Sequence, residues 1–400
     1  MKRHTGQDRS ITSRWRPATQ AVRGGTARSE WGETSEALFL TSGYTYDKAA
    51  DAAARFSGEQ KGMTYSRLQN PTVQMLEQRL ALMEGAEACR VMATGMAAMT
   101  AALLCQVEQG DHIVAGRAAF GSCRWLTDTF LPKFGVTSTI VDGRDTDAWK
   151  DAIRPNTKIF FFETPANPTL DIVDIEAVCG IAREAGIVSV VDNAFATPLL
   201  QRPLDLGADV VAYSATKMMD GQGRVLAGSV AGSEEFIENT LLAFTRNTGP
   251  TLSPFNAWVV LKSLETLDLR IRRQSENALK VANFLDERVE TLYPGLSGHP
   301  QHALAMKQME AAGTIMAINV EGRSQAHALL DALELIDISN NIGDSRSLMT
   351  HPSSTTHAGL SEDVRLAMGV GEGMLRLNVG LEDPQDVIDD LDRALKAVGL

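Results

Sequence analysis

The sequence predicts a doubly wound α/β domain followed by a smaller α+β domain. Between residues 89 and 232, short apolar runs of β-type composition alternate with helical patterns. The runs are continuously apolar, as expected of strands buried on both faces of a mostly parallel sheet. After "GPTLSPFNAW" the alternation stops and a long helical segment begins. The two patterns indicate two domains with different architectures.

The N-terminal part of the chain shows weak periodicity, and we expect an arm over residues 1–65. The arm passes into the polar stretch "GEQKGMTYSRLQNPT", whose Gly and Asn-Pro signals lead into a helix. The helix "VQMLEQRLALMEG" has apolar positions at helical spacing and stops at Gly85.

The large domain is expected over residues 66–256. Its predicted strands are "CRVMA", "HIVA", "TSTIV", "KIFFFE", "IVSVV", "DVVAYS" and "VLAGSVAG". The smaller domain, over residues 257–400, begins with a helical segment from about Trp258 to Leu292, closed by the breaker "YPGLSGHPQH". A strand "TIMAINV", a helix "SQAHALLDALE", a turn-rich "SNNIGDSRSLMTHPSSTTH", a strand "GMLRLNVG" and a helix "PQDVIDDLDRALKAV" complete it.

The amino-acid composition and net charge argue against some classes of function. The chain has 400 residues, 44% hydrophobic and 22% charged, with a formal net charge of −12, which argues against nucleic acid as a partner. No run reaches the ~18 uninterrupted apolar residues of a membrane span, and the basic N-terminus lacks the apolar core of a signal peptide. We therefore expect no membrane association and a cytoplasmic location.

The cysteines and histidines give no sign of a disulfide framework or a metal site. The four cysteines form no C-x-x-C pair, and the seven histidines include no H-E-x-x-H or H-x-x-x-H pair. We expect no metal, so that demanding chemistry would need an organic cofactor.

Polar residues follow several predicted strands at the sheet edge where ligands bind in open α/β folds. Asp192 ends one strand, and Lys217 follows "AYSAT" at the end of another. Structural roles remain open for both, because a buried carboxylate could simply pair with a basic residue. A lysine buried there would nevertheless have a lowered pKa and a nucleophilic amine. In "VMATGMAAMTAALL", Gly95 opens a helix whose free amides could hold an anion or serve packing alone.

Pyridoxal phosphate (PLP) would account for these features together. Its aldehyde needs a lysine, its ring nitrogen a carboxylate and its phosphate an anion site. We assign Lys217 to the aldehyde and Asp192 to the ring nitrogen. The phosphate is assigned to the hydroxyls and amides of four residues, Ser214, Thr216, Gly95 and Met96. Glycine signatures of dinucleotide and nucleoside triphosphate sites are absent.

Six separated motifs resemble the Cys/Met-metabolism family of fold-type I PLP-dependent enzymes. They are "YSRLQNPT", "ETPANPT", "VVDNAF", "SATK" with the following glycine loop, "SLMTHPSSTTH" and "LRLNVGLED". The likeness covers the chain from about Ala21 onward. It implies a central, mostly parallel, seven-stranded sheet with a smaller α+β C-terminal domain, and PLP as the cofactor.

The resemblance also implies roles that residue patterns alone do not give. Tyr65 and Arg67 would reach the cofactor phosphate of a neighbouring subunit, within a homo-oligomer that shares its active sites as a dimer of dimers. Arg376 would bind the substrate α-carboxylate with help from Asn167 and the backbone around Ser347; a guanidinium fork suits a carboxylate. Without the resemblance, Arg67 would be interpreted as a surface residue and Arg376 as a salt-bridge partner.

The sequence departs from the family where many members stack a tyrosine over the cofactor ring. Phe120 stands at this position, in "AAFGSCRWL". Phenylalanine can stack, but it has no hydroxyl to exchange a proton, so proton transfer would depend more on Lys217. Arg124 could lie near the distal carboxylate of a succinyl group or serve at the rim or in the structure.

The implied activity is a γ-replacement in methionine biosynthesis, in which sulfide replaces the succinyl group of O-succinylhomoserine to give homocysteine. Arg346, where many lyases of the family carry an acidic residue, favours this reaction, although it could be an exposed turn residue. Cystathionine γ-synthase and methionine γ-lyase activities remain alternatives. A non-catalytic regulatory protein on the same scaffold is a further alternative; Lys217 and Asp192 argue against it.

Overall fold

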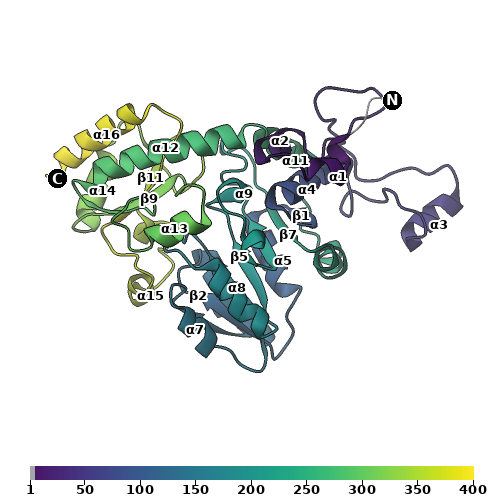
Figure 1. Cartoon of the computed structure of the whole chain (residues 1–400), viewed down its shortest axis with the longest axis horizontal. Helices are drawn as coiled ribbons and strands as arrows, with labels where there is room; N and C mark the ends of the chain where they lie inside the picture. The colour runs from purple at the N-terminus through teal and green to yellow at the C-terminus, as the bar shows by residue number, and fades with distance from the viewer. Residues whose placement is uncertain (1–4) are drawn as a thin grey trace.

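The seven predicted strands of the large domain form one sheet in the computed structural model, which describes residues 5–400 (Figure 1). The strand order is β1-β7-β6-β5-β4-β2-β3. Only β7 runs antiparallel to its neighbours; the other adjacent pairs are parallel. The strands are β1 (Ala88–Met92), β2 (His112–Gly116), β3 (Thr137–Val141), β4 (Thr157–Glu163), β5 (Val188–Asp192), β6 (Val210–Tyr213) and β7 (Gly228–Gly232). The prediction of a mostly parallel sheet is confirmed.

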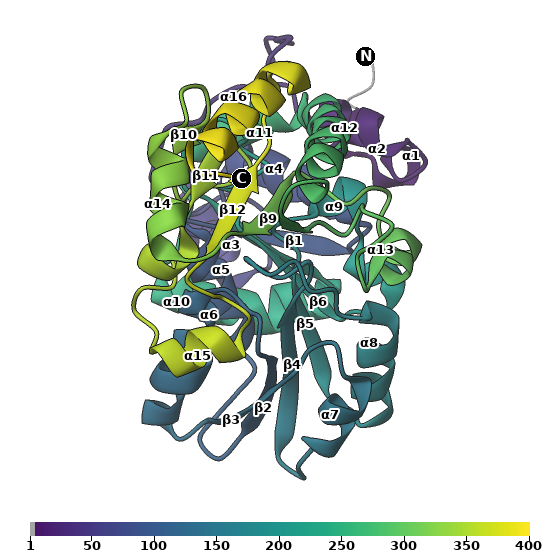
Figure 2. The ribbon, with the colours of Figure 1, turned by 90° about the vertical axis from the view of Figure 1, so that its left-hand side faces the viewer.

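Helices cover both faces of this sheet, which explains why most of its strands are largely apolar. Along β4, Phe160 and Phe162 face one hydrophobic cluster, and Ile159 and Phe161 face the other. Figure 2 shows α7 and α8 beside one face and α5, α6 and α10 beside the other. These helices are α5 (Gly95–Leu104), α6 (Gly121–Trp125), α7 (Thr146–Asp151), α8 (Ile175–Glu184) and α10 (Leu242–Thr248). The domain also contains α9 (Thr197–Leu200).

The helix predicted before the first strand is α4 (Pro71–Glu84), and its sequence sets both ends. The Asn70 side chain accepts hydrogen bonds from the amides of Thr72 and Val73 at 3.0 and 3.4 Å, and Pro71 occupies the first turn. Gly85 ends the helix in the left-handed conformation, with φ of 78°.

The C-terminal domain differs from the prediction in several places, including two helices, His302–Gln308 and Glu362–Ala367, and a short strand, Asp337–Ile338, that the sequence pattern did not predict. The expected helix from Trp258 to Leu292 is divided into α11 (Pro254–Leu264), α12 (Leu267–Asp286) and strand β8 (Glu290–Leu292). The first break occurs at Thr266, whose backbone leaves the helical region (φ −111°, ψ 4°). The stretch predicted to consist of turns also contains β11 (Leu348–Thr350), which pairs with β12.

A five-stranded sheet organises this domain in the order β10-β11-β12-β9-β8. Its remaining strands are β9 (Ile315–Asn319), β10 (Asp337–Ile338) and β12 (Met374–Asn378), and its helices are α13 (His302–Gln308), α14 (Arg323–Asp331), α15 (Glu362–Ala367) and α16 (Pro384–Ala397). Figure 2 shows this sheet beside one end of the larger sheet. Short 3-10 segments cover Thr5–Gln7, Leu131–Phe134, Pro203–Leu206 and Pro352–Ser354, and π-helical turns cover Leu126–Phe130 and Phe236–Leu241.

The N-terminal arm is more helical than its sequence pattern indicates. It contains α1 (Arg9–Thr12), α2 (Pro17–Arg23) and α3 (Ala49–Ser57); residues 1–4 of the predicted arm lie outside the described residues. In Figure 1, α3 stands apart from the rest of the molecule, and none of its residues is buried.

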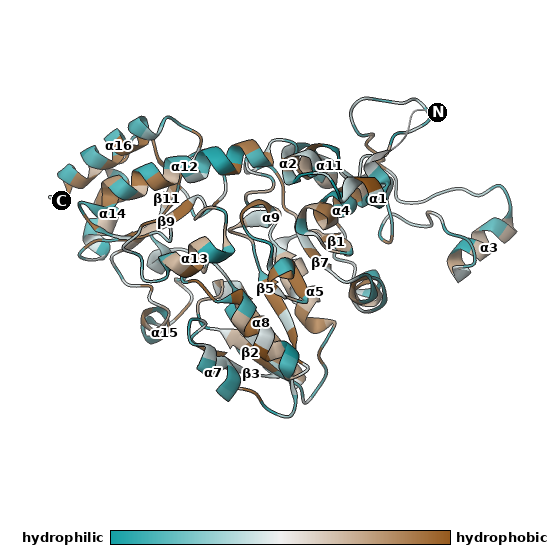
Figure 3. Cartoon of the chain, viewed as in Figure 1, coloured by the Kyte–Doolittle hydropathy of each residue, from teal (hydrophilic) through white to brown (hydrophobic). Residues whose placement is uncertain are grey.

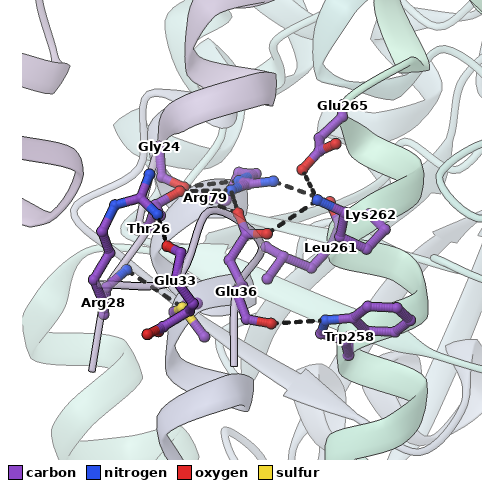
Figure 4. Close-up of polar contacts among 12 residues, drawn as sticks. Gly24, Thr26, Arg28, Glu33, Glu36, Arg79, Trp258, Leu261, Lys262 and Glu265 are labelled. Atoms are coloured by element: carbon purple, nitrogen blue, oxygen red, sulfur yellow. Dashed lines mark hydrogen bonds and ion pairs between the residues drawn. The ribbon is translucent and has the colours of Figure 1, made fainter. Parts of the chain in front are cut away.

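A buried ion pair ties the first half of the arm to the large domain (Figure 4). The fully buried guanidinium of Arg79 binds the carboxylate of Glu36 at 2.8 Å and the carbonyl of Gly24 at 2.7 Å. Lys262 binds the same carboxylate at 3.1 Å, and the Trp258 indole donates to the Glu36 carbonyl at 3.0 Å. Hydrogen bonds to the large domain continue as far as Phe39, whose amide donates to the Thr72 hydroxyl and whose carbonyl accepts from the Asn70 side chain, both at 2.9 Å.

Apolar colour concentrates in the strands, whereas the outer helices show mixed faces (Figure 3). Among residues 5–400, no helix combines the length and the apolar character required to cross a bilayer.

Candidate functional site

A cavity of about 200 Å³ lies where the two domains meet at the carboxyl ends of the large sheet. Strands β4, β5 and β12 contribute to it, as do the first turns of α5 and α6. The lining residues are Gly95, Met96, Met99, Phe120, Cys123, Glu163, Asn167, Asp192, Ala194, Phe195, Ser214, Lys217, Asn340, Ile342, Thr356 and Arg376. The cavity thus gathers most of the predicted site residues from distant parts of the sequence.

Lys217 lies in the turn that follows β6. Its backbone amide donates to the Ser214 carbonyl at 3.1 Å, and its Nζ donates to the Asn341 side-chain oxygen at 2.9 Å. Burial, together with the positive charge of Arg376, lowers the pKa of Lys217 to about 8. The amine of Lys217 therefore loses its proton more readily than that of an exposed lysine.

Two carboxyl groups end adjacent strands at the floor of the cavity. Glu163 on β4 is the register partner of Asp192 on β5. Asp192 accepts from the Ala194 amide at 3.0 Å, and Glu163 accepts from the Phe120 amide at 2.7 Å. Burial raises the pKa of Asp192 to about 7, and burial and the neighbouring Asp192 raise the pKa of Glu163. Neither carboxyl forms an ion pair within residues 5–400.

Arg376 faces the same cavity from the opposite domain. Its guanidinium is 2% exposed and donates to the Asn167 side-chain oxygen at 2.8 Å and to the Asn340 carbonyl at 2.9 Å. Burial lowers the pKa of Arg376 to about 10, and Glu163 partly opposes this shift. Arg376 therefore stays charged at neutral pH and is held by two neutral acceptors, an arrangement that leaves its charge available to an anion.

The predicted anion site lies at the start of α5. A Cβ placed on Gly95 would lie 2.6 Å from the Ser214 Oγ, so only glycine permits this approach. The first amides of a helix have no partner within the helix, and here those of Gly95 and Met96 border the cavity. Thr216 does not line the cavity, and its hydroxyl donates to the Ala227 carbonyl and accepts from the Ala227 amide at 3.1 and 2.9 Å.

The described residues fit PLP. The lysine amine, an unpaired buried carboxyl and a helix start that a Cβ would block lie around one cavity. Phe120 lines it as well and could cover a flat ring. The donor and acceptor set therefore suits an aldehyde, a protonated ring nitrogen and a phosphate.

Two other predicted residues lie outside the cavity. The Arg124 guanidinium binds Asp128 at 2.6 Å and the Arg117 carbonyl at 2.8 Å, so its hydrogen-bonding groups are directed to its own helix and loop. The Ser347 amide and hydroxyl donate to the carboxylate of Glu382 at 2.7 and 3.0 Å.

Tyr65 and Arg67 also lie away from the cavity of their own chain. The Tyr65 side chain is 45% exposed, and the Arg67 guanidinium lies over its ring at 5.5 Å. Arg67 also donates to the Arg246 carbonyl. Both follow the projecting helix α3 in the chain.

The sequence pattern missed Glu163, Asn340 and Thr356, which line the cavity, and Asn341, which is not a lining residue but binds the amine of Lys217. Glu163 carries the same signal as Asp192, a carboxylate that closes an apolar strand, and this signal could have found it. Asn341 carries none, because it lies in the turn-rich stretch of the C-terminal domain and meets Lys217 only in the folded chain.

Known proteins resemble this chain in sequence and in fold. An O-succinylhomoserine sulfhydrylase of Mycobacterium tuberculosis is 47% identical, covering 94% of this chain and 95% of its own. An O-succinylhomoserine sulfhydrylase of Pseudomonas aeruginosa is 45% identical, covering 95% of each chain. A Campylobacter jejuni protein solved with N'-pyridoxyl-lysine-5'-monophosphate superposes with a TM-score of 0.92 at 33% identity, covering 96% of this chain and 100% of the other.

The family comparison spans nearly the whole chain. Residues 18–396 match the family described as Cys/Met metabolism PLP-dependent enzyme. This range includes both sheets and every residue that lines the cavity. The chain therefore belongs to the Cys/Met metabolism family of PLP-dependent enzymes.

Proposed function

We propose that the chain is a PLP-dependent enzyme that replaces the succinyl group of O-succinylhomoserine with sulfide and so forms homocysteine for methionine biosynthesis. The observation that carries the proposal is the single cavity in which Lys217, Asp192 and Arg376 meet. The two sulfhydrylase relatives, each aligned over about 95% of its length, support the choice of reaction.

Lys217 would hold the cofactor aldehyde, and Asp192 would face the ring nitrogen. The amides of Gly95 and Met96, with the hydroxyls of Ser214 and Thr216, would hold the phosphate. When bound, PLP supplies an electron sink for the bonds at the substrate Cα. A protonated ring nitrogen beside Asp192 would favour the ionised carboxylate, since an opposite charge offsets the burial that raises its pKa.

The protein side chains would orient the substrate and move its protons. Arg376 would bind the α-carboxylate, because its guanidinium is buried, charged and already fixed by Asn167 and Asn340. The amine of Lys217, with a pKa of about 8, could take a proton from Cα and return it later. Phe120 has no ionisable group, which leaves Lys217 as the proton carrier at Cα.

We also propose that a second copy of the chain completes the site, within a homo-oligomer that is a dimer of dimers. The projecting α3 and the exposed Tyr65 and Arg67 support this assembly, since these residues have little contact with their own chain's cavity. Tyr65 and Arg67 would then reach the neighbour's phosphate site. The cytoplasmic location stays a prediction.

A substrate matrix tests the reaction. Purified enzyme is given O-succinyl-, O-acetyl- and O-phosphohomoserine, each with sulfide and with cysteine, and kcat/KM is measured for homocysteine, cystathionine and oxo-acid products. We expect the largest kcat/KM for O-succinylhomoserine with sulfide. Faster turnover with cysteine would indicate a cystathionine γ-synthase, and dominant oxo-acid formation without a thiol would indicate a lyase.

A further inference from the structure

One loop of the C-terminal domain contacts both cationic side chains of the cavity. In "SNNIGDSR", residues 339–346, the Asn341 side-chain oxygen accepts from the Nζ of Lys217 at 2.9 Å. The carbonyl of the preceding residue, Asn340, accepts from the Arg376 guanidinium at 2.9 Å. Consecutive residues therefore hold the proposed proton carrier and the proposed carboxylate-binding group.

Backbone contacts fix this loop against the turn that carries Lys217. The Ser345 amide donates to the Gly221 carbonyl at 2.9 Å. Gly343 has a positive φ of 74°, and a Cβ added there would lie 2.5 Å from the Met218 nitrogen. The Gly343 amide also donates to the Asn378 side chain at 2.8 Å. The Asn341 side chain thus reaches Lys217 from a firmly held backbone.

Asn341 is a neutral partner for the amine. Its amide oxygen can accept a hydrogen bond from an ammonium or an amine, but it does not take up a proton near neutral pH. The ionisable groups that share the cavity with Lys217 are Asp192 on β5, Glu163 on β4, Cys123 on α6 and Arg376 on β12. Within residues 5–400, Lys217 forms no ion pair with a carboxylate. Asn341 therefore holds the amine without competing for its proton.

We propose that Asn341 is a positioning residue for the amine of Lys217. Whenever this amine is not joined to the cofactor, Asn341 holds it on the side of the cavity where Arg376 would bind the substrate carboxylate. The inference rests on the proposed function. Arg376 fixes the substrate carboxylate, and Asn341 keeps the amine of Lys217 near the substrate Cα, the carbon to which this carboxylate is attached. The loop thereby sets the spacing between the two groups.

The test begins with the cofactor-free protein. Lys217 is labelled with acetic anhydride over a range of pH, and its modification is quantified by peptide mass spectrometry; only the neutral amine reacts. The wild-type midpoint is expected at a pH of about 8. Asn341→Asp should raise the midpoint by about one pH unit, because a carboxylate favours the ammonium, and Asn341→Ala should lower it, because the ammonium loses an acceptor.

A matched control adds the same charge elsewhere. Asn283→Asp changes an exposed asparagine on α12 that hydrogen-bonds only within its helix, to the Leu279 carbonyl at 2.9 Å. Its labelling midpoint should equal that of wild type. Aspartate has nearly the same shape as asparagine, so Asn341→Asp can still be measured if Asn341→Ala fails to fold.

The loaded enzyme gives the second readout. Asn341→Ala should lower kcat about tenfold with KM within about twofold, because the amine loses one charge-assisted hydrogen bond while Arg376 still binds the carboxylate. Unchanged midpoints in both Asn341 variants would overturn the inference, as would an increase in KM at constant kcat. The labelling needs no turnover, so failure of the proposed reaction with every O-acylhomoserine is a separate result.

Discussion

At the residue scale, the least ordinary feature is the pair of buried carboxyls at the ends of β4 and β5. Glu163 and Asp192 are register partners, both line the cavity, and each is 5% exposed. Burial raises the pKa of both carboxyls, and repulsion by Asp192 raises the pKa of Glu163 further. A cationic ring nitrogen placed beside Asp192 would relieve this repulsion.

Asp192→Asn should reduce kcat/KM by roughly 100-fold, or about 2.7 kcal/mol, because an amide cannot keep the cofactor ring nitrogen protonated. The measurement is steady-state turnover together with the absorbance of the bound cofactor. Asp151→Asn, an exposed position at the end of α7, is the control and should match wild type. Equal activity in the two variants would refute the role of Asp192.

Glu84, a buried carboxyl outside the cavity, should make the stability of the protein depend on pH. Tyr213 donates its hydroxyl hydrogen bond to Glu84, and burial raises the pKa of Glu84 from 4.5 to about 8. The folded state therefore keeps a proton that the unfolded chain releases above about pH 4.5. Between that pH and about 8, rising pH favours unfolding by up to about 1.4 kcal/mol per unit.

Glu84→Gln should remove this contribution, because glutamine does not ionise. Urea denaturation of wild type and variant at pH 5.5, 6.5 and 7.5 gives the difference in free energy of unfolding. As pH rises, the free energy of unfolding of the variant should increase relative to that of wild type. A difference that is constant across the three pH values would contradict a neutral, buried Glu84.

The sequence predicts individual site residues where a chemically reactive side chain or a glycine closely follows a predicted strand. Lys217, Asp192 and Gly95 follow apolar runs, and the structure brings all three to one cavity. The role of Arg376 needed the family resemblance, since an isolated arginine in a strand has no chemical signature. Asn341 could not be predicted, because its contact with Lys217 joins residues 124 positions apart.

At the element scale, the start of α5 is the part of the fold that prepares an anion site. Gly95 allows the helix to meet the Ser214 backbone and side chain so closely that a Cβ would lie 2.6 Å away. The helix N-terminus adds a partial positive charge at the same point.

Gly95→Ala should weaken PLP binding by about tenfold or more, since the added methyl displaces Ser214 and crowds the helix start. The measurement is the PLP dissociation constant of the cofactor-free protein. Gly180→Ala provides the control, because a Cβ on this glycine of α8 meets nothing within 4 Å and alanine favours a helix. If the two variants bind PLP equally, the anion site lies elsewhere.

Elements were predictable where burial alone determines the pattern. Strands β2, β4, β5, β6 and β7 are buried along nearly their whole length and therefore appear as largely apolar runs, whereas the edge strand β3 is only partly buried. The break between α11 and α12 was missed, because Thr266 is compatible with a continuing helix. β11 was missed because a three-residue strand within a polar loop has too few positions to show a period.

At the scale of the whole molecule, the arm has two parts with different attachments. Its first part is held by the buried Arg79–Glu36 pair, whereas α3 projects from the body with no buried residue (Figures 1 and 4). The helices of the arm could not be predicted from weak periodicity. Its proposed partner is a second copy of the chain, which a single sequence reveals only through family resemblance.

Complementation tests the shared site. Arg67→Ala and Lys217→Ala chains should each be inactive alone, the former because the neighbour's phosphate loses a contact. Refolding an equal mixture should restore about a quarter of wild-type activity, since half of the dimers would contain one intact site of two. No recovery in mixed dimers verified by mass spectrometry, or an active monomer, would show that Arg67 does not act across an interface.

The most direct measurement of the central claim is borohydride reduction of the PLP-loaded protein followed by peptide mass spectrometry. The account predicts a yellow protein whose colour borohydride abolishes, with one pyridoxyl phosphate group fixed on Lys217 and none bound covalently in Lys217→Ala. A colourless protein that takes up no PLP, or a group fixed on a different lysine, would contradict it.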